Sequence, residues 1–166
     1  AHRLPLQSLA QQRILAFLKT LNNQTASSRN SSTKPRSPKM TPLELKEAYQ
    51  RGENISALLR DHLDSTTNTE EIIEISYDLQ AGSYIASMEK KDYADQKTRY
   101  SKELVKLLDK YGRPSSLIEV GVGEATTLSC VLKALDDPQI VAHGFDISWS
   151  RIACAREYLN ASGLDA

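Results

Sequence analysis

The chain has 166 residues, of which 40% are hydrophobic and 25% are charged, and its formal net charge at pH 7 is +0. This is the composition of a globular protein with room for one domain, and it excludes an apolar stretch of membrane-spanning length. The charge is unevenly distributed. Residues 1–39 hold seven Lys and Arg residues and no Asp or Glu, whereas residues 40–166 carry about −7. We therefore expect two unlike segments, joined near Met40.

Residues 1–39 are expected to be a basic, largely disordered extension. They begin with an apolar stripe of helical spacing, and residues 25–39 are rich in Ser, basic residues and Pro. This composition is typical of an organelle transit peptide, and it also arises in a non-native extension or a basic arm. No aromatic cluster accompanies the basic residues, so nucleic-acid binding is not indicated. We expect a cytoplasmic protein, or a mitochondrial one if this segment is a transit peptide.

Residues 40–112 are predicted to form a helical region ahead of the first strand. Thr41 and Glu44 form the pattern of a capping box, while Asn54 and Asn68 have the residue type of N-caps. Gly112 is expected to end the last helix. From these signals and from apolar periodicity we predict four helices, over residues 41–51, 54–63, 68–81 and 83–111.

Two apolar runs further along the chain each end in a chemically distinctive residue. The run 117–120 leads directly into Gly121-Val122-Gly123, and the run 140–145 ends at Asp146. Glycine permits positive φ and lets backbone N–H groups approach a ligand closely. A carboxylate at the carboxyl end of the neighbouring strand can accept both hydroxyls of a ribose. The pattern predicts a strand–helix–strand–helix unit that binds a nucleoside, with the ribose between the turn and Asp146.

The spacing of the small residues separates two classes of nucleoside ligand. A dinucleotide fingerprint, Gly-x-Gly-x-x-Gly/Ala, would place its last small residue at Thr126, whereas the small residue is Ala125. Glu124 would also bring negative charge against a pyrophosphate. The segment 119–125, Glu-Val-Gly-Val-Gly-Glu-Ala, instead resembles the first motif of the class I S-adenosylmethionine-dependent methyltransferases.

The resemblance continues in the segment 144–148, Gly-Phe-Asp-Ile-Ser, and covers roughly residues 100–164. It implies an S-adenosylmethionine cofactor and transfer of a methyl group to an acceptor that the sequence does not identify. It implies no particular catalytic residue. The resemblance assigns Glu119, Gly121 and Gly123 to the methionine end of the cofactor, Asp146 to its ribose and Ile147 to its base.

The family fold is a seven-stranded sheet flanked by helices, and the resemblance implies that this chain holds only its N-terminal part. We expect a Rossmann-like α/β fold of strand, helix, strand and helix, with a Gly cap near residue 163. Residues 113–166 would be the first half of the cofactor-binding domain, and residues 40–112 a helical cap. We do not expect this portion alone to methylate an acceptor, and we expect its open sheet edge to favour self-association.

Other functions stay open. One is an NAD(P)-dependent oxidoreductase, and another is a non-catalytic binding module with a nucleoside-binding fold. In a purely structural interpretation, Glu119 caps a loop, the glycines form a tight turn and Asp146 is a helix N-cap. In either interpretation, we expect Asp146 or Ser148 to cap the following helix. If Asp146 binds the ribose, Asp146→Ala should weaken cofactor binding by about tenfold or more and leave the melting temperature nearly unchanged.

The remaining residues with chemical potential are few. Cys130 and Cys154 have no neighbouring Cys or His in the sequence, so we expect neither a metal site nor a disulfide. His143 lies inside the second apolar run and is expected to be buried in the core. The four tyrosines between residues 77 and 100 are expected to be half-buried packing residues, with contact to a ligand as the alternative. Trp149 is expected to lie along the adenine or to pack on the sheet.

Overall fold

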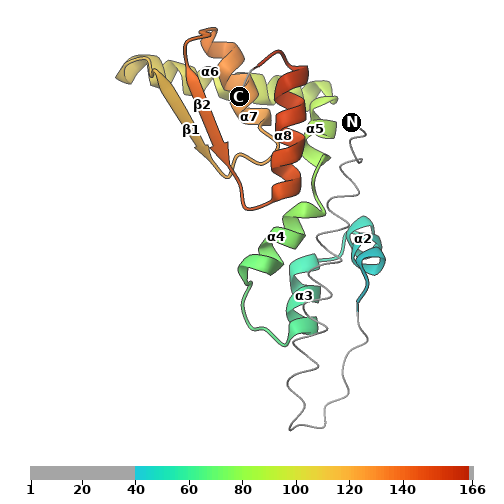
Figure 1. Cartoon of the computed structure of the whole chain (residues 1–166). Coiled ribbons are helices and arrows are strands. Elements are labelled where there is room, and N and C mark those ends of the chain that lie inside the picture. The colour runs from blue at the N-terminus through green and yellow to red at the C-terminus, as the bar shows by residue number, and fades with distance from the viewer. Residues whose placement is uncertain (1–39, 165–166) are drawn as a thin grey trace, which may run out of the picture. The chain divides into compact units, whose positions relative to one another are not determined.

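The computed structural model describes residues 40–164, which belong to two compact units. The described part of the first unit covers residues 40–79 and contains helices and the turns between them, whereas that of the second covers residues 80–164 and contains both strands (Figure 1). The predicted α/β class is confirmed for this part of the chain. The extension predicted over residues 1–39 lies outside the described residues.

The first unit contains helices α2 (Pro42–Gln50), α3 (Ile55–Leu63) and α4 (Glu70–Asp78). The predicted capping box is confirmed, because the Thr41 hydroxyl accepts the N–H of Glu44 at 3.2 Å and the Glu44 carboxylate accepts the N–H of Thr41 at 2.6 Å. Asn54 caps α3 as predicted. The prediction for α4 is wrong at both ends, since Thr69 is its N-cap and the helix ends at Asp78.

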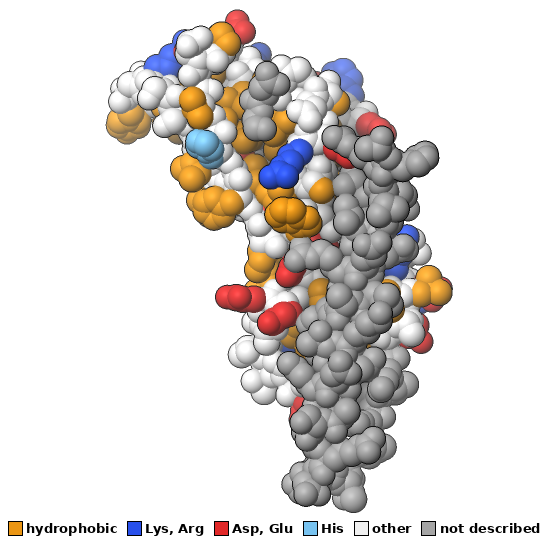
Figure 2. Space-filling view, viewed as in Figure 1, with side chains coloured by type: hydrophobic (Ala, Val, Ile, Leu, Met, Phe, Trp, Pro, Cys, Tyr) orange, Lys and Arg blue, Asp and Glu red, His pale blue; other side chains and the backbone are white. Residues whose placement is uncertain are grey.

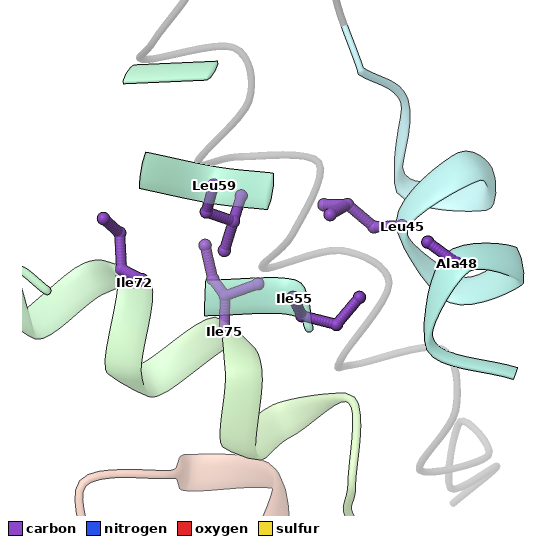
Figure 3. Packing of buried hydrophobic residues seen from close by; sticks show 6 residues of the cluster. All are labelled: Leu45, Ala48, Ile55, Leu59, Ile72 and Ile75. Atoms are coloured by element: carbon purple, nitrogen blue, oxygen red, sulfur yellow. The ribbon is translucent and has the colours of Figure 1, made fainter. Parts of the chain in front are cut away.

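The three helices of the first unit share one apolar core. Its side chains come from all three helices and point toward one another (Figure 3). The Ser56 and Ser76 hydroxyls, on α3 and α4, are hydrogen-bonded at 2.9 Å beside it. The buried members of this core are Leu45, Ala48, Ile55, Leu59, Ile72 and Ile75.

The second unit begins with helices α5 (Ser83–Met88) and α6 (Lys91–Tyr111). We predicted one helix over 83–111, which is wrong because Lys90 has extended backbone angles, φ −82° and ψ 118°. The apolar periodicity on both sides of this break does not reveal it. Gly112 ends α6, as predicted, with φ 104°. Both helices lie in the same unit as the sheet.

The predicted order of strand, helix, strand and helix is confirmed in the rest of this unit. Strands β1 (Ser116–Val120) and β2 (Val141–Phe145) are parallel, and their register runs from Ser116 opposite Val141 to Val120 opposite Phe145. Helix α7 (Thr126–Leu135) connects them, and α8 (Trp149–Ala161) follows β2. Gly163, with φ 71°, follows the end of α8 as expected for a Gly cap.

The two faces of this sheet have different surroundings. The face of Ala142 packs on a core from α7, α8 and the β1–α7 turn: Val122, Ala125, Leu128, Ala155 and Leu159. The opposite face, which we call the open face, is exposed in the described part of the chain, and Figure 2 shows hydrophobic side chains gathered over the strands. The residues of the open face are Ile118, Val120, Val141, His143 and Phe145. The prediction that His143 is buried is therefore wrong.

Candidate functional site

The turn between β1 and α7 has an unusual backbone conformation. Gly121, Gly123 and Ala125 all have positive φ, at 70°, 55° and 55°. This region is accessible to glycine at little cost, whereas a residue with a Cβ loses about 1 kcal/mol or more there. The N–H groups of Gly121 and Val122 both donate to the Phe145 carbonyl, at 2.9 and 3.0 Å. The path of the turn is therefore fixed by the carboxyl end of β2.

Asp146 and the glycine turn, predicted to lie on either side of a ribose, are brought together by the structure. Asp146 Oδ2 accepts the N–H of Gly123 at 2.9 Å, and Oδ1 accepts the N–H of Ser148 at 2.9 Å. A carboxylate has about four acceptor positions, so these two bonds leave capacity for ligand hydroxyls. They also mean that Asp146 supports the local fold. We expected Asp146→Ala to leave the melting temperature nearly unchanged. This geometry does not favour that expectation.

The residues after Asp146 start α8 and present apolar surface. The Ser148 hydroxyl accepts the N–H of Arg151 at 3.2 Å, which confirms that this serine caps the helix. Ile147 is 44% exposed and Trp149 is 52% exposed. The Arg156 guanidinium lies 5.9 Å from the centroid of the Trp149 ring. Exposed apolar side chains thus follow Asp146 in the chain at the carboxyl end of β2.

Glu119 lies in a different environment, in a hollow between α6, β1 and α7. The volume of this hollow is about 440 Å³, and its lining is mostly apolar, including Tyr100, Leu104, Leu117, Leu128 and Val131. Burial raises the pKa of the Glu119 carboxyl, while the charge of Lys97 and the backbone N–H of Leu128 offset part of this rise. Of the five residues predicted for the cofactor site, only Glu119 lines this hollow.

Glu124 occupies a position that the sequence does not reveal. We considered its charge only as an obstacle to a pyrophosphate, yet its side chain is buried and its residue is 1% exposed. Its Oε2 accepts the N–H of Ile85 in α5 at 2.8 Å, and its Oε1 lies 3.8 Å from Nε of Arg151 in α8. These partners are distant in the sequence and follow no motif, so no local signal predicts them.

The Arg151 guanidinium lies close to an aromatic ring and to the glycine turn. Its Cζ is 4.8 Å from the centroid of the Tyr84 ring, a distance suited to a cation–π contact. A β-carbon placed on Gly123 would lie only 2.9 Å from Nη2 of Arg151. Tyr84 is 39% exposed, in agreement with the half-buried packing residue that we predicted. The guanidinium can lie here because Gly123 has no side chain.

Among residues 40–164, no group of three or more His, Cys, Asp or Glu side chains could hold a metal ion, and no helix is long and apolar enough to cross a membrane. Cys130 and Cys154 are free thiols, and burial raises the pKa of Cys154 to about 11. Comparison of the chain with known proteins identifies no matching family model, no matching curated protein and no matching solved structure.

Proposed function

We propose that this chain binds S-adenosylmethionine and acts in the transfer of its methyl group to an acceptor. The observation that carries the proposal is the 2.9 Å hydrogen bond from the Gly123 N–H to the Asp146 carboxylate. It joins the glycine turn after β1 to the acid after the adjacent parallel strand β2. This is the arrangement that a nucleoside site at the carboxyl ends of parallel strands requires.

The proposed fold is the N-terminal part of a Rossmann-like class I methyltransferase. In its support, β1, α7, β2 and α8 follow one another in the required order, and the strands are parallel and adjacent. The open face also supports it. Parallel sheets are normally covered on both faces, and this one is covered on one face only in the described part of the chain.

In the proposed complex, each predicted residue has a defined role. The ribose hydroxyls donate to the free acceptor positions of Asp146, and the base lies on the exposed side chain of Ile147, with Trp149 nearby. The methionine end lies along Gly121, where a β-carbon would meet no protein atom within 4 Å. Glu119 lines this end of the ligand from the hollow between α6, β1 and α7.

An NAD(P)-dependent oxidoreductase is the main alternative, and one feature argues against it. A dinucleotide places its pyrophosphate against the turn and the start of the following helix. Its fingerprint has Gly or Ala at the position of Thr126, which starts α7 and is 5% exposed, whereas the small residue of this chain is Ala125.

Residue-resolved NMR titration of the full chain tests the proposal. S-adenosylhomocysteine, added up to millimolar concentration, should shift the amide resonances of Gly121, Gly123 and Ile147, and NAD⁺ at equal concentration should not. NMR suits this test because it also detects weak binding. Shifts with NAD⁺ alone would identify a dinucleotide site, and no shift with either ligand would contradict the proposal.

A matched pair of glycine variants separates ligand contact from backbone strain. Gly121→Ala and Gly52→Ala each place a methyl group in open space on a backbone with similar positive φ, 70° and 79°. Both should lower stability by a similar amount, about 1 kcal/mol. Only Gly121→Ala should also weaken S-adenosylhomocysteine binding, because Gly52 follows α2 in the other unit.

A further inference from the structure

The buried pair of Glu124 and Arg151 joins three segments that are separate in the sequence. Glu124 comes from the β1–α7 turn, Arg151 from the first turn of α8, and Ile85, whose N–H donates to Glu124, from α5. The Tyr84 ring, also from α5, has its centroid 4.8 Å from Cζ of the same guanidinium. Helix α5 is thereby attached to the glycine turn through one carboxylate and one guanidinium.

The burial of this pair reduces its net contribution to stability. Glu124 is 1% exposed and Arg151 is 8% exposed, so both charges are largely removed from water. Oε1 of Glu124 has no hydrogen-bond partner among the described residues, and its distance of 3.8 Å from Nε is that of a loose ion pair. Desolvation of such a pair offsets much of its Coulomb attraction, and an apolar pair of similar volume is often as stable.

We propose that Glu124 is a positioning residue that holds α5 and the Arg151 guanidinium against the glycine turn, so that α5 forms one wall of the nucleoside site. This inference rests on the proposed function for its ligand. Removing the carboxylate frees the N–H of Ile85 and leaves Arg151 without this counter-charge at Gly123. If α5 is not held in place, it must become ordered when the ligand binds. This ordering costs free energy and therefore lowers the affinity for the ligand.

The test compares three variants of the full chain. Glu124→Gln keeps an oxygen that can accept the N–H of Ile85 but removes the charge that faces Arg151. Glu124→Ala removes both interactions. Glu53→Gln is the control, because Glu53 makes an exposed ion pair with Arg51 in the other unit. Amide hydrogen exchange at Ile85 reports the attachment of α5, and NMR titration with S-adenosylhomocysteine reports ligand affinity.

We expect exchange at Ile85 to be fastest in Glu124→Ala, intermediate in Glu124→Gln, and unchanged in Glu53→Gln. The dissociation constant for S-adenosylhomocysteine should rise by about tenfold in Glu124→Ala, with a smaller rise in Glu124→Gln. Equal exchange at Ile85 in Glu124→Ala and the unmodified chain would overturn the positioning role. So would faster exchange at Ile85 with unchanged affinity.

The two proposals fail in different ways. If the unmodified chain binds no S-adenosylhomocysteine, the proposed function fails, and the exchange rates still decide whether Glu124 holds α5 against the turn. If the unmodified chain binds the ligand and the Glu124 variants bind it equally well, the proposed function stands and Glu124 is not a positioning residue.

Discussion

Val122 packs directly over Gly144. A β-carbon at residue 144 would lie 2.7 Å from Cγ2 and 2.9 Å from Cβ of Val122. Val122 is buried in the core formed with α7 and α8, so it has little room to move. This contact holds the turn after β1 close to β2.

The contact predicts a specific effect of Gly144→Ala. The added methyl group should destabilise the fold by about 1 to 3 kcal/mol through overpacking, measured by chemical denaturation. The double variant Gly144→Ala/Val122→Ala should recover little of this loss, because Cβ of residue 122 stays 2.9 Å from the added methyl group. A single variant as stable as the unmodified chain would show that the turn shifts freely away from β2.

Asp146 and Ser148 give a second prediction, because they share a supporting role in α8 but differ in their proposed role toward the ligand. Asp146→Asn keeps one acceptor oxygen and loses the charge, while Ser148→Ala loses the N-cap of α8. Each should lower stability by about 1 kcal/mol. Only Asp146→Asn should weaken S-adenosylhomocysteine binding, by about tenfold. Parallel loss of affinity in both variants would assign Asp146 a structural role only.

Glu119 gives a prediction about pH. Because burial raises its pKa above 4.5, the folded chain holds this proton more tightly than the unfolded chain does. Its contribution to stability is therefore full below about pH 4.5 and is lost as the pH rises through the pKa of the folded state. Glu119→Gln, which stays neutral, should raise the melting temperature more at about pH 7 than at about pH 4.

Glu71→Gln is the opposite control for Glu119. A hydrogen bond from the Thr69 side chain lowers the pKa of Glu71, so its contribution is present above pH 4.5 and is lost as the pH falls through the folded pKa. Glu71→Gln should therefore lower the melting temperature at neutral pH, by a small amount because the group is exposed. The same sign of change in both variants would contradict the assignment for Glu119.

The open face of the sheet predicts self-association of the chain. Ile118 is 67% exposed and Val120 is 71% exposed, on a strand that pairs only with β2 among the described residues. Exposed apolar strands readily pair with other chains. Light scattering should show oligomers that dissociate on dilution, and the double variant Ile118→Thr/Val120→Thr should associate less. Leu43→Gln, at an exposed leucine of α2, should not change the association.

The elements that the sequence predicts well are those with local signals. Thr41 with Glu44, and Asn54, cap helices through atoms three residues away, so the residue types alone indicate the helix starts. The two strands are marked by apolar runs that end at Gly121 and Asp146. The α/β class and the order of these elements follow from such patterns.

The features that the sequence does not predict depend on partners that are distant in the chain. Asn68 and Thr69 are both suitable N-caps, and the Asn68 side chain instead accepts a hydrogen bond from Arg60. Glu124 and Ile85 are 39 residues apart, and nothing in the motif indicates that this acid turns inward. The environment of His143 depends on which face of the sheet is covered, and alternation along one strand does not decide that.

The two amide groups that share the Phe145 carbonyl have a consequence for folding. Because the N–H groups of Gly121 and Val122 bond to the last residue of β2, the turn cannot take its shape before the strands pair. Formation of the turn therefore requires the paired sheet. The Gly123 amide resonance should disappear at a urea concentration no higher than the one at which the strand resonances disappear, and its survival beyond them would contradict this order.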